Sequence, residues 1–182
     1  MMHIKAEFKY GINEKLSCAA VELPYRGKSL SMFILLPDKG VISLSEVEKK
    51  MTYDDLVNVT DKFAMFPLEV KLWLPRFSLD EKLNLGRMLT GIGMKDLFNE
   101  GAADLSGIDG SKKLYVSKML HRAVIEVNEE GTEAAAATVV ETMYRSAPLE
   151  MEFRADRPYI FFIQDKATKS ILFLGRLVKP SA

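Results

Sequence analysis

Runs of apolar residues bounded by turn residues predict strands in the first part of the chain. Residues 18–23 and 30–36 are apolar at most positions, and turn residues at 37–40 follow the second run. Two such runs in succession favour an antiparallel pair with a buried face. Between 68 and 77, apolar residues alternate with charged residues and a tryptophan, which predicts a half-buried strand.

The middle of the chain carries signals typical of helices. Ser45 stands directly before residues 46–48, at a position suited to an N-cap, and residues 53–59 predict a second short helix. Residues 80–98 are helical in character, with a break at the Gly-Ile-Gly sequence of 91–93. We therefore expect helices between two groups of strands.

The last third of the chain predicts further strands. Strand-like residues extend over 114–128, and 149–153 is a short candidate strand. Residues 158–164 and 171–178 are apolar at consecutive positions on either side of a polar turn, which predicts a hairpin covered on both faces. This order of strands, helices and strands is typical of an α+β fold with mixed and antiparallel sheets. Such apolar strands need other strands or helices to cover them, and the chain supplies these only in part. We therefore interpret the chain as part of a larger domain with a shared core.

Composition narrows the classes of function. The chain has 182 residues, enough for a domain with a core, and its 25 lysines and arginines equal its 25 aspartates and glutamates. A net charge of zero predicts no nucleic-acid and no membrane partner, and no apolar run is long enough to span a bilayer. Cys18 is the single cysteine, and no cluster of metal-ligand residue types stands out in the sequence. We therefore expect no disulfide, no metal and no other cofactor.

Residues 129–146 differ from the rest of the chain. Their alanine run between glutamates favours an ordinary helix, whereas the β-branched run at 138–140 favours a strand. With a period of two, one face is small and uncharged, and the other collects Glu133 and Glu141. Because its small face carries no charge, such a strand can insert between two strands of a sheet without burying an ion. This property is typical of a segment that changes conformation. The uncharged face consists of Thr132, Ala134, Ala136, Thr138, Val140 and Thr142.

Arg145 is the only basic residue between Glu129 and Phe153. A trypsin-like protease carries a carboxylate at the base of its specificity pocket, so it would cut the bond between Arg145 and Ser146. Tyr144 leaves a second interpretation open, in which a chymotrypsin-like protease cuts the chain after Tyr144 instead.

Residues 129–138, Glu-Glu-Gly-Thr-Glu-Ala-Ala-Ala-Ala-Thr, resemble the hinge in the reactive-centre loop of an inhibitory serpin. Further segments resemble the same family in the same order, namely 33–38, 74–77, 103–108, 116–123, 157–163 and 173–180. The resemblance covers the whole chain and implies the serpin fold. Since serpins are much longer, residues 1–182 would form the C-terminal half of one serpin domain, with the loop at 129–148. The N-terminal half of the same domain would be a missing partner.

The resemblance implies a suicide-substrate inhibitor rather than an enzyme. A trypsin-like serine protease would be held as a covalent acyl complex on Arg145, and Ser146 would leave as a new N-terminus. Met143, Tyr144 and Ala147 would tune the choice of protease. The hinge that enters the main sheet would comprise Glu129, Glu130, Gly131, Thr132, Glu133, Ala134, Ala135, Ala136 and Ala137. The alternative is a truncated or non-inhibitory serpin that acts as a carrier or binding protein, or as a plain protease substrate.

Two residues outside the loop carry weaker expectations. His121 lies in a strand without a nearby nucleophile, which favours a core histidine, and the resemblance implies a structural role where the main sheet opens. Asn58 begins an Asn-Val-Thr triplet, an acceptor for N-glycosylation in a secreted protein. With the arginine bait, this triplet favours an extracellular protein, and a cytoplasmic one remains the alternative. The first five residues lack the apolar region of a signal peptide, which is uninformative in a chain that starts inside a domain.

Overall fold

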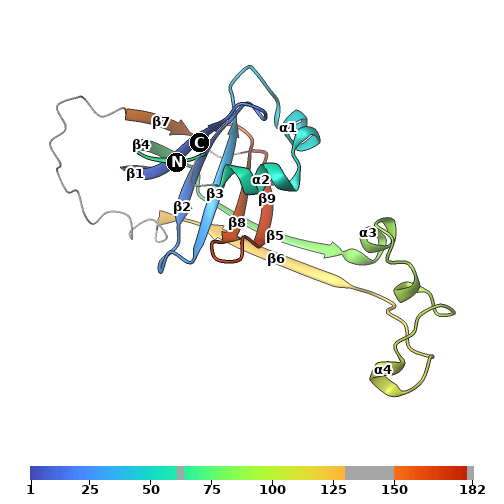
Figure 1. Cartoon of the computed structure of the whole chain (residues 1–182). Helices are drawn as coiled ribbons and strands as arrows, with labels where there is room; N and C mark the ends of the chain where they lie inside the picture. The colour runs from blue at the N-terminus through green and yellow to red at the C-terminus, as the bar shows by residue number, and fades with distance from the viewer. Residues whose placement is uncertain (61–63, 130–149, 180–182) are drawn as a thin grey trace. The chain divides into compact units, whose positions relative to one another are not determined.

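The chain divides into two compact units in a computed structural model. The structure describes residues 1–60, 64–129 and 150–179 (Figure 1). One unit consists of Met1–Phe77 and Val127–Ala182, and the other of Ser78–Glu126. Among the described residues, no helix has the length and apolarity that a membrane span requires.

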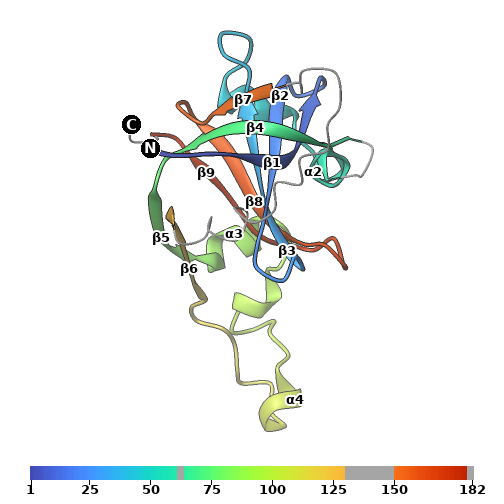
Figure 2. The same cartoon turned by 90° about the vertical axis from the view of Figure 1, so that its left-hand side faces the viewer.

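The first unit is built on a seven-stranded sheet in the order β7-β4-β1-β2-β3-β8-β9 (Figure 2). Neighbouring strands are antiparallel except β4 and β7, which run parallel. The strands are β1 (Met2–Asn13), β2 (Cys18–Pro24), β3 (Leu30–Pro37), β4 (Phe66–Leu74), β7 (Glu150–Arg154), β8 (Tyr159–Asp165) and β9 (Ile171–Leu177). These strands confirm the predicted antiparallel pair, the short strand near 150 and the C-terminal hairpin.

The alternation predicted between 68 and 77 is present in β4. Val70, Leu72 and Leu74 are buried, and Lys71 and Trp73 point to the other face. The strand nevertheless ends at Leu74 rather than at 77. The proline that follows has no N–H group for the next ladder hydrogen bond.

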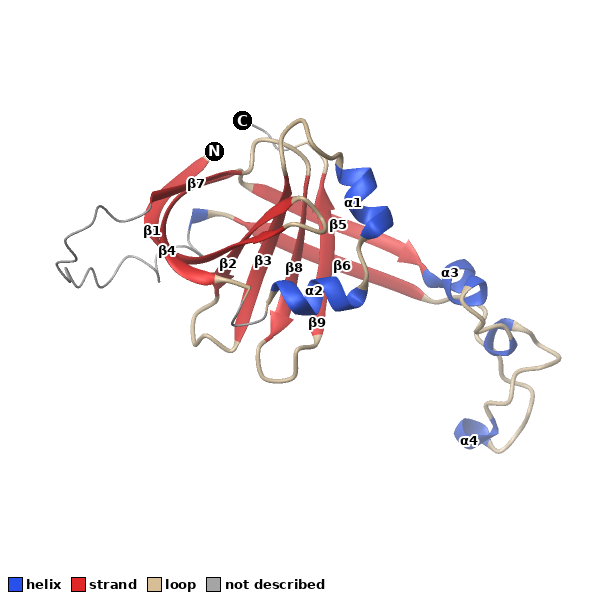
Figure 3. Ribbon diagram, turned by 45° about the horizontal axis from the view of Figure 1, so that its top comes forward, coloured by secondary structure: helices blue, strands red, loops and turns tan. Residues whose placement is uncertain are grey.

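Two helices cover one face of β2, β3 and β8 (Figure 3). Helix α1 (Leu44–Lys50) begins after Ser43, whose hydroxyl accepts a hydrogen bond from the Glu46 backbone N–H at 3.3 Å. The Glu46 carboxylate accepts the Ser43 backbone N–H in return at 2.9 Å, so the pair forms a capping box. The prediction of Ser45 as the N-cap was therefore wrong by two residues, because Glu46 fits the third position after Ser43.

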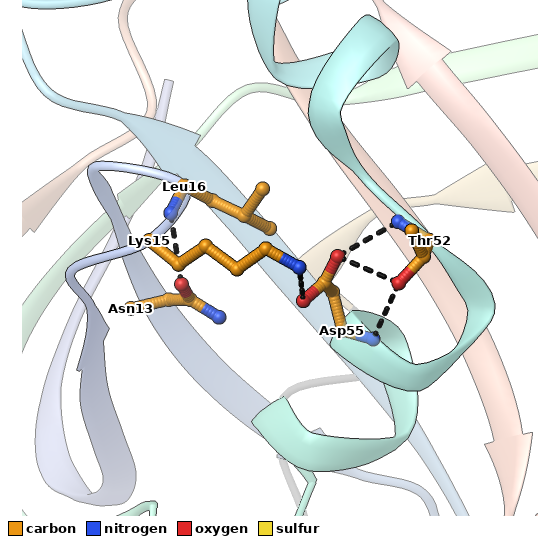
Figure 4. Close-up of polar contacts among 5 residues, drawn as sticks. All are labelled: Asn13, Lys15, Leu16, Thr52 and Asp55. Atoms are coloured by element: carbon orange, nitrogen blue, oxygen red, sulfur yellow. Dashed lines mark hydrogen bonds and ion pairs between the residues drawn. The ribbon is translucent and has the colours of Figure 1, made fainter.

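Helix α2 (Tyr53–Val59) has the predicted bounds and is fixed by a buried carboxylate, shown in Figure 4. Asp55 accepts the Thr52 backbone N–H at 2.8 Å and the Lys15 ammonium at 2.6 Å. The hydrogen bond from Lys15, followed by those from Thr52, lowers the pKa of Asp55 in spite of its burial. Asn13 accepts the Leu16 N–H at 2.9 Å and so holds the turn that carries Lys15.

The core of this unit lies between these helices and the sheet. It combines Val47 of α1 and Leu56 of α2 with side chains from β2, β3 and β8. The strand residues of this cluster are Cys18, Ala20, Phe33, Leu35, Ile160 and Phe162. Burial raises the pKa of the Cys18 thiol to about 12, which makes it an apolar packing residue.

The C-terminal hairpin is only partly covered. Strand β8 is buried from Tyr159 to Gln164, as predicted. Strand β9 is not, because Leu172 is 51% exposed, Phe173 40% and Leu174 55%. Among the described residues it lies at the end of the sheet and pairs with β8 alone. The prediction that both strands are covered on both faces is wrong for β9, and this exposure agrees with the interpretation of a partial core.

The second unit contains the two-stranded sheet of β5 (Phe77–Asn84) and β6 (Leu120–Val127). Between them lie α3 (Leu85–Gly91), the 3₁₀ turn Asp96–Phe98 and α4 (Ser106–Asp109). The prediction of a helix from 80 was wrong for 80–84. These residues pair with β6, and Arg122 donates two hydrogen bonds to Asp80 across the pair, at 2.7 and 2.6 Å. The predicted strand over 114–128 is shorter in the structure and starts at Leu120.

A buried carboxylate ties the turn of the C-terminal hairpin to the rest of the sheet. Glu22 on β2 is 4% exposed and accepts hydrogen bonds from Ser31 at 2.7 Å and from the Lys166 ammonium at 2.6 Å. Lys9 lies 3.2 Å from its other oxygen. Burial by itself would raise the pKa of Glu22, but the bonds from Lys166 and Ser31 outweigh it and hold the pKa below its ordinary 4.5.

Replacement of Lys166 by Met should destabilise the folded protein by about 1 kcal/mol at pH 7, because Lys9 and Ser31 still contact the buried Glu22. A lowered folded-state pKa stabilises the fold above pH 4.5 and ceases to do so as the pH falls through that pKa. Urea unfolding of the full-length protein that contains this chain, at pH 7 and pH 3, should therefore show a difference between Lys166→Met and wild type that shrinks in acid. Lys39→Met, at an exposed position, is the control. An equal loss at both pH values would contradict this role of Glu22.

Candidate functional site: the base of the predicted reactive-centre loop

The predicted reactive-centre residues lie almost entirely outside the described residues. This holds for the hinge residues 130–137 and for 143–147, which include the Arg145–Ser146 bond. The structure describes the two positions from which the predicted loop leaves and to which it returns. These are Glu129 and Glu150, and an ion-pair network holds each of them.

Glu129 is held by Arg76. Both the Nε and the Nη2 groups of Arg76 contact the Glu129 carboxylate, and this hydrogen bonding lowers the pKa of Glu129. Strand β4 ends at Leu74, and Arg76 follows after Pro75. Arg76 belongs to the segment 74–77, which carries part of the family resemblance. The start of the predicted loop is therefore fixed to the segment that follows β4, the strand next to β7 in the sheet.

Glu150 is the first residue of β7 and lies between two lysines. Its carboxylate is 2.8 Å from the Lys5 ammonium on β1 and 2.9 Å from the Lys71 ammonium on β4. Lys5 also pairs with Glu69 at 2.7 Å. The hydrogen bond from Lys5, followed by that from Lys71, lowers the pKa of Glu150. The end of the predicted loop is thus attached to β4, the neighbour of β7 in the sheet, and to β1, the next strand beyond it.

The register of these strands explains the network. Glu69 lies opposite Glu150, and Lys5 lies opposite Lys71, so like charges are direct neighbours across the strands. The lysines reach the glutamates diagonally, within the range that long side chains cover on one face of a sheet. We call the outward side of these three strands the charged face. It consists of His3, Lys5, Glu7, Glu69, Lys71, Trp73, Glu150, Glu152 and Arg154.

An aromatic residue lies at the far end of this face. Trp73 is half-buried, with the His3 ring 4.7 Å from its ring and the Arg154 guanidinium 4.7 Å from its ring centroid. A cation over an indole face is a favourable contact. The stack joins β1, β4 and β7 at one level.

The sequence contained a signal for this face that we did not use. Residues 3–9 alternate between charged or polar and apolar side chains, which is the pattern of a half-buried strand. Strand β1 follows that pattern, with Phe8 buried and His3, Lys5 and Glu7 exposed. We did not predict Arg76 as a partner of Glu129, because the contact joins residues 53 positions apart.

The two weaker candidate residues are both exposed in this chain. His121 lies on β6 and is exposed, so the expectation of a core histidine is wrong within the described residues. Its structural role where the main sheet opens stays a prediction. Asn58 lies in the last turn of α2 and lines a cavity of about 340 Å³ together with Asn13, Glu14 and Met65. Within the described part of the chain, no three His, Cys, Asp or Glu side chains gather in a way that could hold a metal ion.

The chain is an α+β structure in which Glu129 and Glu150, the described residues on either side of 130–149, are both held by ion pairs. The family model described as "Serpin (serine protease inhibitor)" matches residues 1–180. The chain belongs to the serpin family. This confirms the family and the fold expected from the sequence, and a family of inhibitors bears out the expectation that the chain is not an enzyme.

Similar proteins extend beyond this chain. It is 45% identical to the leukocyte elastase inhibitor of Equus caballus and 44% identical to that of Homo sapiens, each over 99% of this chain and 48% of the relative. A crystal structure of maspin matches with a TM-score of 0.87 and 30% identity, over 98% of this chain and 47% of that one. Uncleaved ovalbumin matches with a TM-score of 0.82 and 34% identity, over 98% and 44%. The chain therefore spans about half the length of the relatives that it matches.

Glu150→Gln should loosen β7, because a neutral amide pairs less well with Lys5 and Lys71 than a carboxylate does. In the full-length protein that contains this chain, we expect faster hydrogen exchange at the backbone amides of β7 with little change in β8. Since the folded-state pKa of Glu150 is lowered, wild type should approach the variant as the pH falls through that pKa. Glu152→Gln on the same strand is the matched control. Equal exchange in all three proteins at pH 7 would show that the lysines do not hold β7.

Proposed function

We propose that the full-length protein containing this chain inhibits serine proteases by a suicide-substrate mechanism. The match of residues 1–180 to the serpin family carries this proposal. The hinge-like sequence at 129–138 supports it, because its small uncharged face is suited to enter a sheet. The ion pairs at Glu129 and Glu150 also support it, since they give the loop two fixed ends.

The reaction would use the bond between Arg145 and Ser146. The protease serine oxygen attacks the Arg145 carbonyl carbon, an ester forms and the peptide bond breaks. The serine proton passes through the protease histidine to the amine of Ser146, which becomes a new N-terminus. The freed segment from about Gly131 to Tyr144 then enters the main sheet as a new strand, a form of strand addition for which serpins are the standard example. The attached protease would be distorted before water can cleave the ester.

Two classes of target protease are open. Arg145 favours a trypsin-like enzyme, because its guanidinium fits a pocket that ends in a carboxylate. The similarity to proteins named leukocyte elastase inhibitors favours an elastase-type target, which would use a bond beside Met143 or Tyr144 instead. The alternative of a carrier or binding protein receives no support from these names.

The compartment of the full-length protein is a related question. The comparisons give no support to a secreted glycoprotein, and they favour the cytoplasmic alternative over the extracellular one. Under this proposal the Asn58 triplet is an ordinary surface sequence at the end of α2.

Arg145→Ala in the full-length protein should abolish inhibition of trypsin, whereas an elastase-type bond beside Met143 or Tyr144 would still be present for elastase. The measurement is covalent complex formation on denaturing gels with a panel of both enzymes, followed by N-terminal sequencing of the released peptide. A peptide that begins at Ser146 identifies the Arg145 bond, and one that begins at Tyr144 or Arg145 identifies the elastase-type alternative. Undiminished inhibition of trypsin would show that another bond is the bait.

Thr132→Arg should turn the full-length inhibitor into a substrate, because a charge on the uncharged face would have to be buried as the segment enters the sheet. Ala134→Arg should do the same. The stoichiometry of inhibition should rise several-fold, with cleaved protein replacing the covalent complex on gels. Glu133→Arg, one position away on the other face, is the matched control. An unchanged stoichiometry in Thr132→Arg would contradict insertion through this face.

The 182-residue chain alone should not trap a protease. The exposed apolar residues of β9 leave an incomplete core, so we expect it to aggregate. Light scattering and the same gel assay test this expectation, and a monomeric chain that forms a covalent complex would contradict it.

A further inference from the structure

Two turns at one end of the large sheet carry a cluster of cations. Residues 25–29 join β2 to β3, and residues 166–170 join β8 to β9 (Figure 3). The turns are neighbours, because the Lys166 backbone N–H donates a hydrogen bond to the Ser29 carbonyl at 2.9 Å. Four cations lie within three residues of this hydrogen bond, and we call them the basic turn cluster. They are Arg26, Lys28, Lys166 and Lys169.

The four strands that lead into these turns contain two acidic residues, and both are already occupied. Glu22 on β2 is the buried carboxylate that accepts a hydrogen bond from Lys166. Asp165 on β8 accepts the N–H groups of Ala167 at 3.0 Å and Thr168 at 2.8 Å, so it stabilises its own turn. These strands therefore leave no carboxylate for the other cations of the cluster.

The side chains of Arg26, Lys28 and Lys169 are exposed and form no ion pair within the described part of the chain. The chain as a whole has a net charge of zero, so these three cations are a local excess of positive charge. Such an excess attracts anions over a short range, about 8 Å at physiological salt. Binding at this end of the sheet would therefore depend on direct contact.

The backbone holds two of these cations in an uncommon conformation. Lys28 has a φ of 58° and Lys169 a φ of 61°, in the left-handed region that favours glycine and asparagine. Hydrogen bonds fix both positions, because the buried Gln164 amide donates to the Lys169 carbonyl at 3.2 Å and the Lys28 N–H donates to the Tyr25 carbonyl at 2.9 Å. Lysines at positions that disfavour them point to a function of their ammonium groups.

The arrangement of the cluster indicates the kind of anion. A phosphate group carries up to two negative charges and binds lysine and arginine through charge-assisted hydrogen bonds. Because the cations come from two short adjacent turns, they suit an anion whose phosphates lie close together. A long polyanion instead uses a row or groove of cations that follows its backbone.

We propose that the basic turn cluster binds a compact anion with several phosphate groups, through Arg26, Lys28 and Lys169. Lys166 remains with Glu22 and so holds the second turn beside the first. The anion is a free phosphorylated molecule or the headgroup of a lipid, since the two share this chemistry. This inference does not rest on the proposed function, because none of these residues takes part in the inhibitory reaction.

The test titrates the full-length protein that contains this chain with inositol hexakisphosphate, a small ring with a phosphate on every carbon. The triple variant Arg26→Gln, Lys28→Asn, Lys169→Asn removes the three unpaired cations. Each exposed ion pair contributes roughly two- to five-fold in affinity, so the dissociation constant from calorimetry should rise about ten-fold or more at about 50 mM salt. The wild-type dissociation constant should itself rise with salt, because exposed charges are screened.

Two controls separate binding from folding and from net charge. Asparagine tolerates positive φ, so thermal unfolding of the triple variant should show no loss of stability. Lys39→Gln, Lys49→Gln, Lys50→Gln removes the same charge from exposed positions beyond the other end of β3, and it should bind as wild type does. An equal loss of affinity in both triple variants would show a response to net charge alone and would overturn the site.

Vesicles of phosphatidylcholine, with and without phosphatidylinositol bisphosphate, distinguish the two sources of the anion. Sedimentation with the phosphorylated vesicles that inositol hexakisphosphate competes away assigns a lipid headgroup, and titration without sedimentation assigns a free anion. No binding of inositol hexakisphosphate by wild type, or equal binding by the Arg26, Lys28 and Lys169 variant, would overturn the inference. Binding of heparin without binding of inositol hexakisphosphate would also overturn it, since the ligand would then be a long polymer. A failure to form a covalent protease complex concerns the proposed function alone.

Discussion

The pairing of β3 with β8 is the contact that joins the C-terminal hairpin to the other five strands of the large sheet. It joins Leu30–Leu35 to Ile160–Asp165, and the Phe33 and Phe162 rings stack at 5.1 Å between the two strands. Bringing residues so far apart in sequence together costs conformational entropy, and burial of both strands offsets that cost. Once β8 is in place, β9 follows through the hairpin, and Lys166 reaches the buried Glu22 of β2.

The same sheet sets the two ends of the predicted loop. β4 supplies Lys71 to Glu150, and Arg76, two residues after its end, holds Glu129. One strand therefore contributes to both attachment points. Exposed ion pairs contribute little to stability, so their effect here is to fix position rather than to add free energy. The parallel pairing of β7 with β4 places Glu150 at the level of Glu69 and makes the diagonal pairs possible.

Local patterns predicted the elements whose signals are complete within a few residues. Helix α2 has its predicted bounds because Thr52 and Asp55 satisfy each other's backbone groups at its start. Strands β2, β3 and β8 are runs of mostly apolar residues, which predict buried strands, and most of their residues are buried. Elements that depend on a distant partner were missed. Residues 80–84 have the local character of a helix and form a strand because β6 pairs with them. Strand β9 has the composition of a buried strand and is exposed because the described chain offers a neighbour on one side alone.

The sequence by itself determined the family, the hinge-like segment at 129–138 and the single basic residue at Arg145, because each is a property of residue types in order. It also carried the alternation that makes β4 half-buried. Only the tertiary structure decided that Arg76 meets Glu129, that Lys5 and Lys71 meet at Glu150, and that Trp73 lies between His3 and Arg154. The physical reason is register. Which charges become neighbours depends on how separate strands align, and that alignment follows from the packing of their buried faces, which no single segment contains.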